Sequence, residues 1–181
     1  MVRLTAGTWR GRKLEIPQGI RPTTELARKA AFDILGETVV GARVLDACAG
    51  SGAYGLEALS RGAAHATFVE VDRGVARVLR GNVERIGAGE AARIEEMSVA
   101  RFSSKARKDG FDVVFHDPPF EAKSEGDLRL LLPLVRSGGW LFHERGDDEV
   151  FHPLGLEPAD RRRYGTTRFL IFRPSGDRQP C

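Results

Sequence analysis

The sequence predicts an α/β protein built on a doubly wound, mostly parallel seven-stranded sheet with helices on both faces. From about residue 42 onward, short apolar runs alternate with segments of helical periodicity, which is typical of consecutive βαβ units. Two later β-like stretches, 160–164 and 168–172, meet around Gly165 and indicate an antiparallel hairpin at one edge of the sheet. The 181 residues are enough for one well-packed domain.

The chain changes character near its fortieth residue. We expect residues 1–40 to form a basic arm and a helix, and residues 41–181 to form the body of the same compact domain. Within the arm, apolar and polar residues alternate over 2–5 and 13–16, which predicts a small β-hairpin.

The helices and strands are predicted from their apolar periods, in order along the chain. The first helix begins after Thr23 or Thr24, either of which can cap it, and ends at Gly36. Later helices are predicted over about 52–60, 75–86, 100–107 and 128–134. Parallel strands are predicted over 44–45, 67–69, 93–95, 112–116 and 140–143, the last after a turn at 137–139.

The composition is that of a globular protein that works in a reducing compartment. Hydrophobic residues make up 41% of the chain and charged residues 29%. No apolar run is long enough to span a membrane, and the N-terminus lacks the apolar core of a signal peptide. Cys48 and Cys181 are the only cysteines. We therefore expect a cytoplasmic protein, without a disulfide framework or membrane association.

Positive charge gathers at both ends of the chain, although the formal net charge is only +3. Residues 1–30 contain seven arginines and lysines against two glutamates, and residues 161–178 contain six arginines against Asp177. Such runs are either solvated surface or a means of binding a phosphate backbone.

The tetrapeptide Asp117-Pro118-Pro119-Phe120 directly follows the predicted strand 112–116. Two consecutive prolines fix φ near about −65° and remove two backbone donors, so this segment forms a rigid corner at the strand's end. The corner offers a carboxylate, free carbonyls and an aromatic ring. A planar base with an exocyclic amine could use all three. Alone, however, a Pro-Pro corner is most often a rigid turn.

A glycine loop follows the first strand of the body, at Asp46-Ala47-Cys48-Ala49-Gly50-Ser51-Gly52. Gly50 and Gly52 let the backbone approach a ligand at a helix N-terminus. An acidic residue at the strand's end opposes a pyrophosphate but suits the α-amino group of an amino-acid-bearing cofactor. The loop therefore favours S-adenosylmethionine over NAD. The alternative interpretation is a tight strand-to-helix turn that binds no ligand and is capped by Asp46.

Two further strand ends supply candidate cofactor contacts. Glu70 ends the second strand, about 20 residues after the glycine loop, where doubly wound folds place a carboxylate for ribose hydroxyls. Asp72 is predicted to cap the next helix. The third strand ends near Met97, which either packs on an adenine ring or belongs to the core. Parallel strands bring these ends to one edge, where open α/β sheets bind ligands.

Two other chemically versatile residues are predicted to be structural. His116 is the only histidine near this edge, and its position in a strand indicates a packed or hydrogen-bonded side chain. Cys48 is interpreted as a small buried side chain rather than a nucleophile. No ligand spacing indicates a metal site, and no G-x-S-x-G elbow supports a hydrolase.

Together these motifs resemble class I S-adenosylmethionine-dependent methyltransferases, and in particular the RsmD-type family of 16S rRNA (guanine-N2)-methyltransferases. The segments that carry the resemblance are Gly-Thr-Trp-Arg-Gly-Arg-Lys-Leu at 7–14, Arg-Pro-Thr-Thr at 21–24, the glycine loop at 46–52, 55–62, Glu-Val-Asp at 70–72 and Asp-Pro-Pro-Phe at 117–120. The chain departs from the family pattern at Ser98, where Asp or Asn is usual, and at Lys29, where an acidic residue is usual.

The resemblance implies a Rossmann-like class I methyltransferase that uses S-adenosyl-L-methionine, needs no metal, and acts as a monomer on 16S rRNA or the small ribosomal subunit. It implies that Asp117 and the Pro118 carbonyl accept the hydrogens of the guanine amine while Phe120 stacks on the base. The implied cofactor contacts are Asp46, Ala49, Gly50, Gly52, Glu70, Val71, Met97 and Ser98. The implied RNA contacts are Trp9, Arg10, Arg12, Lys13, Arg21 and Thr23.

Three alternatives remain open at this point. A similar Pro-Pro corner serves adenine-N6 methylation of DNA or RNA and methylation of protein glutamine. A non-catalytic RNA-binding assembly factor would carry the basic ends but would need no cofactor pocket. An NAD-linked oxidoreductase is disfavoured by the acidic residue in the glycine loop.

Overall fold

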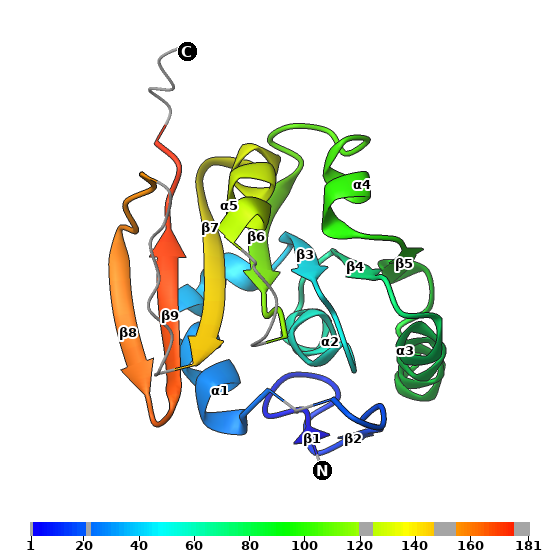
Figure 1. Cartoon of the computed structure of the whole chain (residues 1–181). Coiled ribbons are helices and arrows are strands. Elements are labelled where there is room, and N and C mark those ends of the chain that lie inside the picture. Colours follow the sequence, from blue (N-terminus) through cyan, green and yellow to red (C-terminus); the bar gives the residue numbers. More distant parts are fainter. Residues whose placement is uncertain (1, 21–22, 120–124, 147–154, 176–181) are drawn as a thin grey trace.

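The computed structural model describes residues 2–20, 23–119, 125–146 and 155–175. Its central sheet has seven strands in the order β5-β4-β3-β6-β7-β9-β8 (Figure 1). The strands are β3 (Arg43–Ala47), β4 (His65–Glu70), β5 (Ala92–Glu96), β6 (Phe111–His116), β7 (Val135–Gly146), β8 (Asp160–Tyr164) and β9 (Thr167–Phe172). The first five are parallel, whereas β9 pairs antiparallel with both β7 and β8. The predicted doubly wound sheet with an antiparallel hairpin is confirmed.

Helices cover both faces of the sheet. The helices are α1 (Glu25–Leu35), α2 (Ala53–Ser60), α3 (Arg73–Ile86), α4 (Val99–Ser103) and α5 (Glu125–Leu131), with short 3₁₀ turns at Gly36–Val39, Gly89–Ala91 and Leu132–Leu134. Because successive strand residues face opposite ways, β6 divides its side chains between two cores. Val113 and Phe115 pack with α1, α2 and α3, while Val114 packs with α4 and α5.

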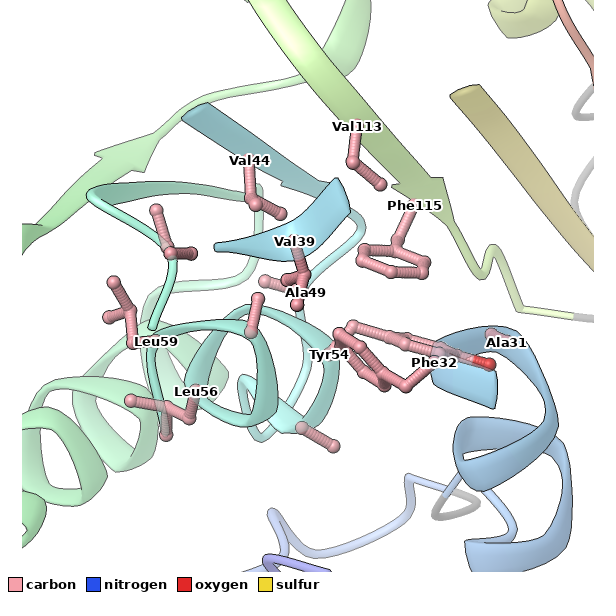
Figure 2. Close-up of a cluster of buried hydrophobic side chains, with 14 of the residues drawn as sticks. Ala31, Phe32, Val39, Val44, Ala49, Tyr54, Leu56, Leu59, Val113 and Phe115 are labelled. Atoms are coloured by element: carbon pink, nitrogen blue, oxygen red, sulfur yellow. The ribbon is translucent and has the colours of Figure 1, made fainter. Parts of the chain in front are cut away.

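An aromatic cluster joins α1 and α2 to the centre of the sheet. The Tyr54 ring stacks on Phe115 with centroids 4.5 Å apart, and the Phe32 ring lies 5.4 Å from Phe115 (Figure 2). Phe142 on the neighbouring strand extends the cluster, with its centroid 5.5 Å from that of Phe115. This packing fixes the end of β6, from which the Asp-Pro-Pro corner projects.

The N-terminal arm is a small hairpin of β1 (Val2–Arg3) and β2 (Lys13–Leu14), as predicted, and it lies beside α1 and α2 (Figure 1). Its apolar side chains Val2, Leu4 and Leu14 belong to the same core as α2. Close backbone contact continues at Gly7, whose φ is +77° and whose added Cβ would lie 1.7 Å from the Ser60 carbonyl oxygen. Only glycine fits there, so the arm packs as an integral layer of the domain.

A buried carboxylate fastens this arm to α2. Glu57 accepts hydrogen bonds from the Thr5 amide at 2.8 Å, the Thr5 hydroxyl at 2.6 Å and the Ala6 amide at 3.1 Å. It also pairs with the Nε atoms of Arg28 at 3.3 Å and Arg61 at 2.8 Å. Glu57 and Arg28 are fully buried. The carboxylate therefore joins the arm, α1 and α2 at one point.

The structure differs from the predicted elements on either side of β7. The helix predicted over 128–134 is α5 followed by a 3₁₀ turn, because Pro133 lacks the N–H that would continue an α-helix. The turn predicted at 137–139 lies within β7, which extends from Val135 to Gly146, and the pairing register with β6 shifts there. The helix predicted over 100–107 ends at Ser103.

Among the described residues, no helix combines the length and apolar character that crossing a membrane requires.

Candidate active site

The carboxyl ends of the parallel strands surround a cavity of about 730 Å³. It lies where the sheet order reverses, between β3 and β6, because β4 and β5 continue on one side of β3 and β7 continues on the other. Open α/β sheets bind ligands at this reversal, and the volume is in the range of small-molecule sites. The glycine loop and the Asp-Pro-Pro corner therefore face one cavity, as the sequence predicted.

Most of the predicted site residues line this cavity. Its wall includes Thr23, Ala49, Gly50, Glu70, Val71, Met97, Ser98, Asp117 and Pro118. Asp46 and Gly52 lie behind the wall. Two predicted residues, Arg21 and Phe120, lie outside the described part of the chain.

Glu70 is held in place by backbone amides at the end of β4. Its Oε2 accepts from the Gly50 amide and its Oε1 from the Asp72 amide, both at 3.0 Å. Asp72 caps α3 by accepting from the Val75 amide, as predicted. The Glu70 carboxylate is thus oriented at the cavity wall by the two loops that a cofactor would contact.

Asp46 supports the glycine loop from behind. Its Oδ2 accepts from the Gly55 amide at 2.8 Å, inside the first turn of α2, and its side chain is buried. Gly52 precedes this helix with φ +81°, and an added Cβ there would lie 2.5 Å from a Leu79 methyl. Burial, followed by the negative charges of Asp117 and Glu70, raises the pKa of Asp46 well above its usual range.

A raised carboxyl pKa means that the charged form of Asp46 opposes folding of the ligand-free protein. The stability that this group contributes is fully present below the unfolded carboxyl pKa of about 3.9 and is lost as pH rises through the folded value. Asp46→Asn keeps an oxygen for the Gly55 amide and removes the charge. We expect the variant to lose less free energy of unfolding than wild type between pH 4 and pH 7. Urea unfolding of both proteins at pH 4 and at pH 7 measures the two losses. Equal losses in wild type and variant would contradict a raised pKa of Asp46.

Asp117 is contacted by the loop that precedes α1. The Thr23 hydroxyl donates to Asp117 Oδ2 at 2.6 Å. The neighbouring Thr24 caps α1 by accepting from the Ala27 amide, which decides between the two cap candidates. The two adjacent threonines therefore have different roles, and the arm reaches the Asp-Pro-Pro corner through Thr23.

Three residues that sequence motifs did not indicate form a hydrogen-bonded group at the cavity. The Tyr54 hydroxyl donates to Glu144, and the Thr167 hydroxyl lies 3.4 Å from the same carboxylate. Glu144 and Thr167 line the cavity. Burial and the charge of Glu144 raise the pKa of Tyr54, so its hydroxyl keeps its proton. Glu144, Thr167 and Tyr54 come from β7, β9 and α2, so only the folded structure shows that these residues form a group.

The predicted RNA-binding residues of the arm lie away from the cavity and differ in their surroundings. Trp9 is half-buried against the core. Arg12 donates to the Ile86 carbonyl at 2.9 Å, where α3 ends, although the residue as a whole is exposed. Arg10 and Lys13 are exposed. The last two are therefore the arm cations best placed to meet a partner.

The strand order, the glycine loop and the Asp-Pro-Pro corner at one cavity define a Rossmann-like fold of the class I methyltransferase type. The chain belongs to the family described as Conserved hypothetical protein 95, whose model matches residues 2–173.

Known relatives agree with this assignment. The chain is 41% identical over 164 residues to Ribosomal RNA small subunit methyltransferase D of Escherichia coli K12, covering 88% of this chain and 80% of that protein. A solved hypothetical protein of Thermus thermophilus is 36% identical, with a TM-score of 0.81 over 96% of this chain and 99% of that one. An RNA methyltransferase of Salinibacter ruber, solved with S-adenosyl-L-homocysteine, shares the fold at 13% identity, with a TM-score of 0.70 over 88% of this chain and 97% of that one.

Proposed function

We propose that this chain transfers a methyl group from S-adenosyl-L-methionine to the exocyclic N2 of a guanine in 16S rRNA, acting as a cytoplasmic monomer on the small ribosomal subunit or an assembly intermediate. The observation that carries the proposal is that one cavity is lined both by Gly50 and Glu70, at the ends of β3 and β4, and by Asp117 and Pro118, after β6. The name of the Escherichia coli relative supports ribosomal RNA as the substrate.

The methyl donor occupies the end of the cavity formed by β3, β4 and β5. Glu70 accepts hydrogen bonds from the ribose hydroxyls, since its carboxylate is already oriented by two amides. Val71, which is 66% exposed, and Met97 offer apolar surface to the adenine ring. Ser98 contributes its backbone there, because its hydroxyl accepts from the Arg101 amide as the cap of α4. The glycine loop faces the amino-acid moiety.

The guanine occupies the end of the cavity at the Asp-Pro-Pro corner. Its N2 is a poor nucleophile, because the lone pair is delocalised into the ring. Asp117 and the Pro118 carbonyl accept the two amine hydrogens, which favours the pyramidal amine and aims its lone pair at the methyl group. Transfer is direct and in line: the sulfur–methyl bond breaks as the nitrogen–methyl bond forms, S-adenosyl-L-homocysteine leaves, and the methylated nitrogen then loses one proton. Positioning therefore supplies most of the acceleration. The base must be splayed out of the folded RNA to reach the corner.

Thr23 holds the Asp117 carboxylate in the orientation that this step requires. Thr23→Val removes the 2.6 Å hydrogen bond with little change in shape. Because a hydrogen bond to a charged group is worth about 1.5–3 kcal/mol, we expect kcat to fall by at least about tenfold. Thr23→Ser keeps the hydroxyl and serves as the matched control. Single-turnover methyl transfer measures both variants, and equal rates for Val and wild type would remove Thr23 from the mechanism.

The exposed cations of the arm are proposed to contact the RNA backbone. Arg10→Ala combined with Lys13→Ala should weaken 16S rRNA binding and lower the slope of log affinity against log salt by roughly 1.5, since each phosphate contact contributes about 0.7–0.9. A matched double variant, Lys105→Ala with Lys108→Ala, removes two exposed lysines that follow α4. Filter binding across a salt series compares them. Identical slopes for the two double variants would refute a specific role of the arm.

Methyl transfer from tritiated S-adenosyl-L-methionine tests the proposed activity. Three acceptors are compared: protein-free 16S rRNA, small ribosomal subunits and double-stranded DNA. We expect label in at least one of the two rRNA-containing acceptors and none in DNA. Label in DNA alone would contradict the proposed substrate class.

A further inference from the structure

Three side chains with metal-ligating atoms meet beside the Asp-Pro-Pro corner. They are Cys48 in the glycine loop, His116 at the end of β6 and Asp127 in α5, and their ligand atoms all lie within 4.8 Å of one another. The strand pairing explains why Cys48 and His116 are close, because Ala47, the residue before Cys48, lies opposite His116 on β6. The three residues are far apart in the sequence, which is why ligand spacing predicted no metal site.

The histidine of this cluster has a buried nitrogen that makes no hydrogen bond. His116 is 1% exposed, and its Nε2 lacks a hydrogen-bond partner among the described residues. Asp127 Oδ2 lies 3.5 Å from this nitrogen, which is an ion-pair distance and too long for a good hydrogen bond. Buried polar atoms are nearly always paired, so an unpaired nitrogen facing two other ligand atoms is evidence for a missing partner.

The other nitrogen of His116 is fixed by a second histidine, His143 on β7, so the expectation that His116 is the only histidine near this edge is wrong. His116 Nδ1 lies 3.1 Å from His143 Nδ1, and the two rings are stacked. When His116 donates its Nδ1 hydrogen to His143, its Nε2 lone pair faces Cys48 and Asp127. Metal-binding histidines are held by outer hydrogen bonds of this type.

The charge around Cys48 also favours a cation. The carboxylates of Glu70, Asp117 and Asp127 line the same cavity as the Cys48 thiol. Their negative charges would stabilise a cation bound to the sulfur.

We propose that Cys48, His116 and Asp127 form a binding site for a thiophilic divalent cation of the zinc class. One thiolate, one imidazole and one carboxylate are a donor set that zinc accepts, and three protein ligands leave a fourth position open. Zinc bonds of about 2.0–2.3 Å place tetrahedral ligands about 3.5 Å apart, so the cluster contracts by about an ångström on binding. Cys48 and Asp127 are only partly buried. The thiol proton is released to solvent as the sulfur–metal bond forms.

The open position faces the cavity, because Cys48 and Asp127 both line it. A bound cation would share the cavity with the corner that receives the base. Occupancy therefore hinders methyl transfer, a consequence that rests on the proposed function.

Cobalt(II) titration of the full chain tests the site, since a sulfur–cobalt bond gives an intense charge-transfer absorption. We expect one equivalent to bind to wild type with this absorption, and zinc to displace it. Cys181→Ser is the control and should behave as wild type. Cys48→Ala should lose the absorption and bind at least about a hundredfold more weakly, and Asp127→Asn about tenfold more weakly. Equal binding by Cys48→Ala and wild type, or loss of the absorption in Cys181→Ser, would overturn the proposal.

The titration contains neither RNA nor methyl donor, so its result is independent of the proposed function. In a separate assay, one equivalent of zinc should inhibit wild type reversibly, with a chelator restoring the rate. Each variant is compared with itself without metal, and Cys48→Ala should be insensitive. Zinc binding without inhibition would refute the proposed hindrance of methyl transfer but would leave the metal site itself in place.

Discussion

Asp117→Ala is expected to lower the rate of methyl transfer by about a hundredfold to a thousandfold while S-adenosyl-L-methionine binds nearly as well as to wild type. The carboxylate acts on the amine as positive charge develops on its nitrogen, and removing one such preorganised partner costs about this much in other enzymes. Cofactor contacts are proposed at the opposite end of the cavity. Single-turnover rates and calorimetric binding of the methyl donor measure the two quantities separately.

Asp117→Asn is the matched control for this prediction. It keeps an oxygen that can accept from the Thr23 hydroxyl, but it lacks the charge. We expect a rate between those of wild type and Asp117→Ala. Full activity in Asp117→Ala would exclude the residue from the reaction, and parallel loss of cofactor binding would give it a structural role instead.

Glu57→Ala is expected to lower the free energy of unfolding by about 3–5 kcal/mol, which is the usual result of removing one partner of a buried ion pair. The substitution leaves the Arg28 guanidinium buried without its carboxylate. It also removes the acceptor for the Thr5 and Ala6 amides, by which the arm is attached to α2. Urea unfolding measures the change.

Arg61→Ala tests whether the effect comes from burial. Arg61 pairs with the same carboxylate, but its side chain is 18% exposed and the buried Arg28–Glu57 pair remains. We expect a loss of about 1 kcal/mol or less from the ion pair. A Glu57→Ala variant that loses no more than Arg61→Ala would show that the arm is held by its apolar contacts alone.

The parallel core of the fold could be predicted from the sequence because its signals are local. The strands β3, β4 and β6 each contain a short apolar run, and α3 carries an apolar face that repeats with the helical period. The path around β7 could not be predicted in the same way. Gly138 and Gly139 are typical of a turn, and they lie where the pairing with β6 skips from Val135 to Trp140. The Gly138 amide instead donates to the Pro174 carbonyl at 2.8 Å, just after β9. Tertiary hydrogen bonds here outweigh the local preference.

The cavity could also be predicted, because strand ends in a parallel sheet meet at one edge. Glu70 and Asp117 lie there for that reason. What the sequence concealed are contacts between distant segments, such as Thr23 with Asp117 and Tyr54 with Glu144. The position of Asp46 behind the cavity wall could not be predicted either, because it depends on the side of the strand end to which its carboxylate points.

The site chemistry makes one measurement the most direct test of the proposed function. Small subunits or 16S rRNA labelled by wild type are digested to nucleosides, and the methylated nucleoside is identified by chromatography and mass spectrometry, with Asp117→Ala as the blank. The proposal predicts N2-methylguanosine as the labelled product of wild type, absent or strongly reduced with Asp117→Ala. N6-methyladenosine in its place would contradict the assignment of guanine to the Asp-Pro-Pro corner, and no label in either acceptor would contradict the proposed activity itself.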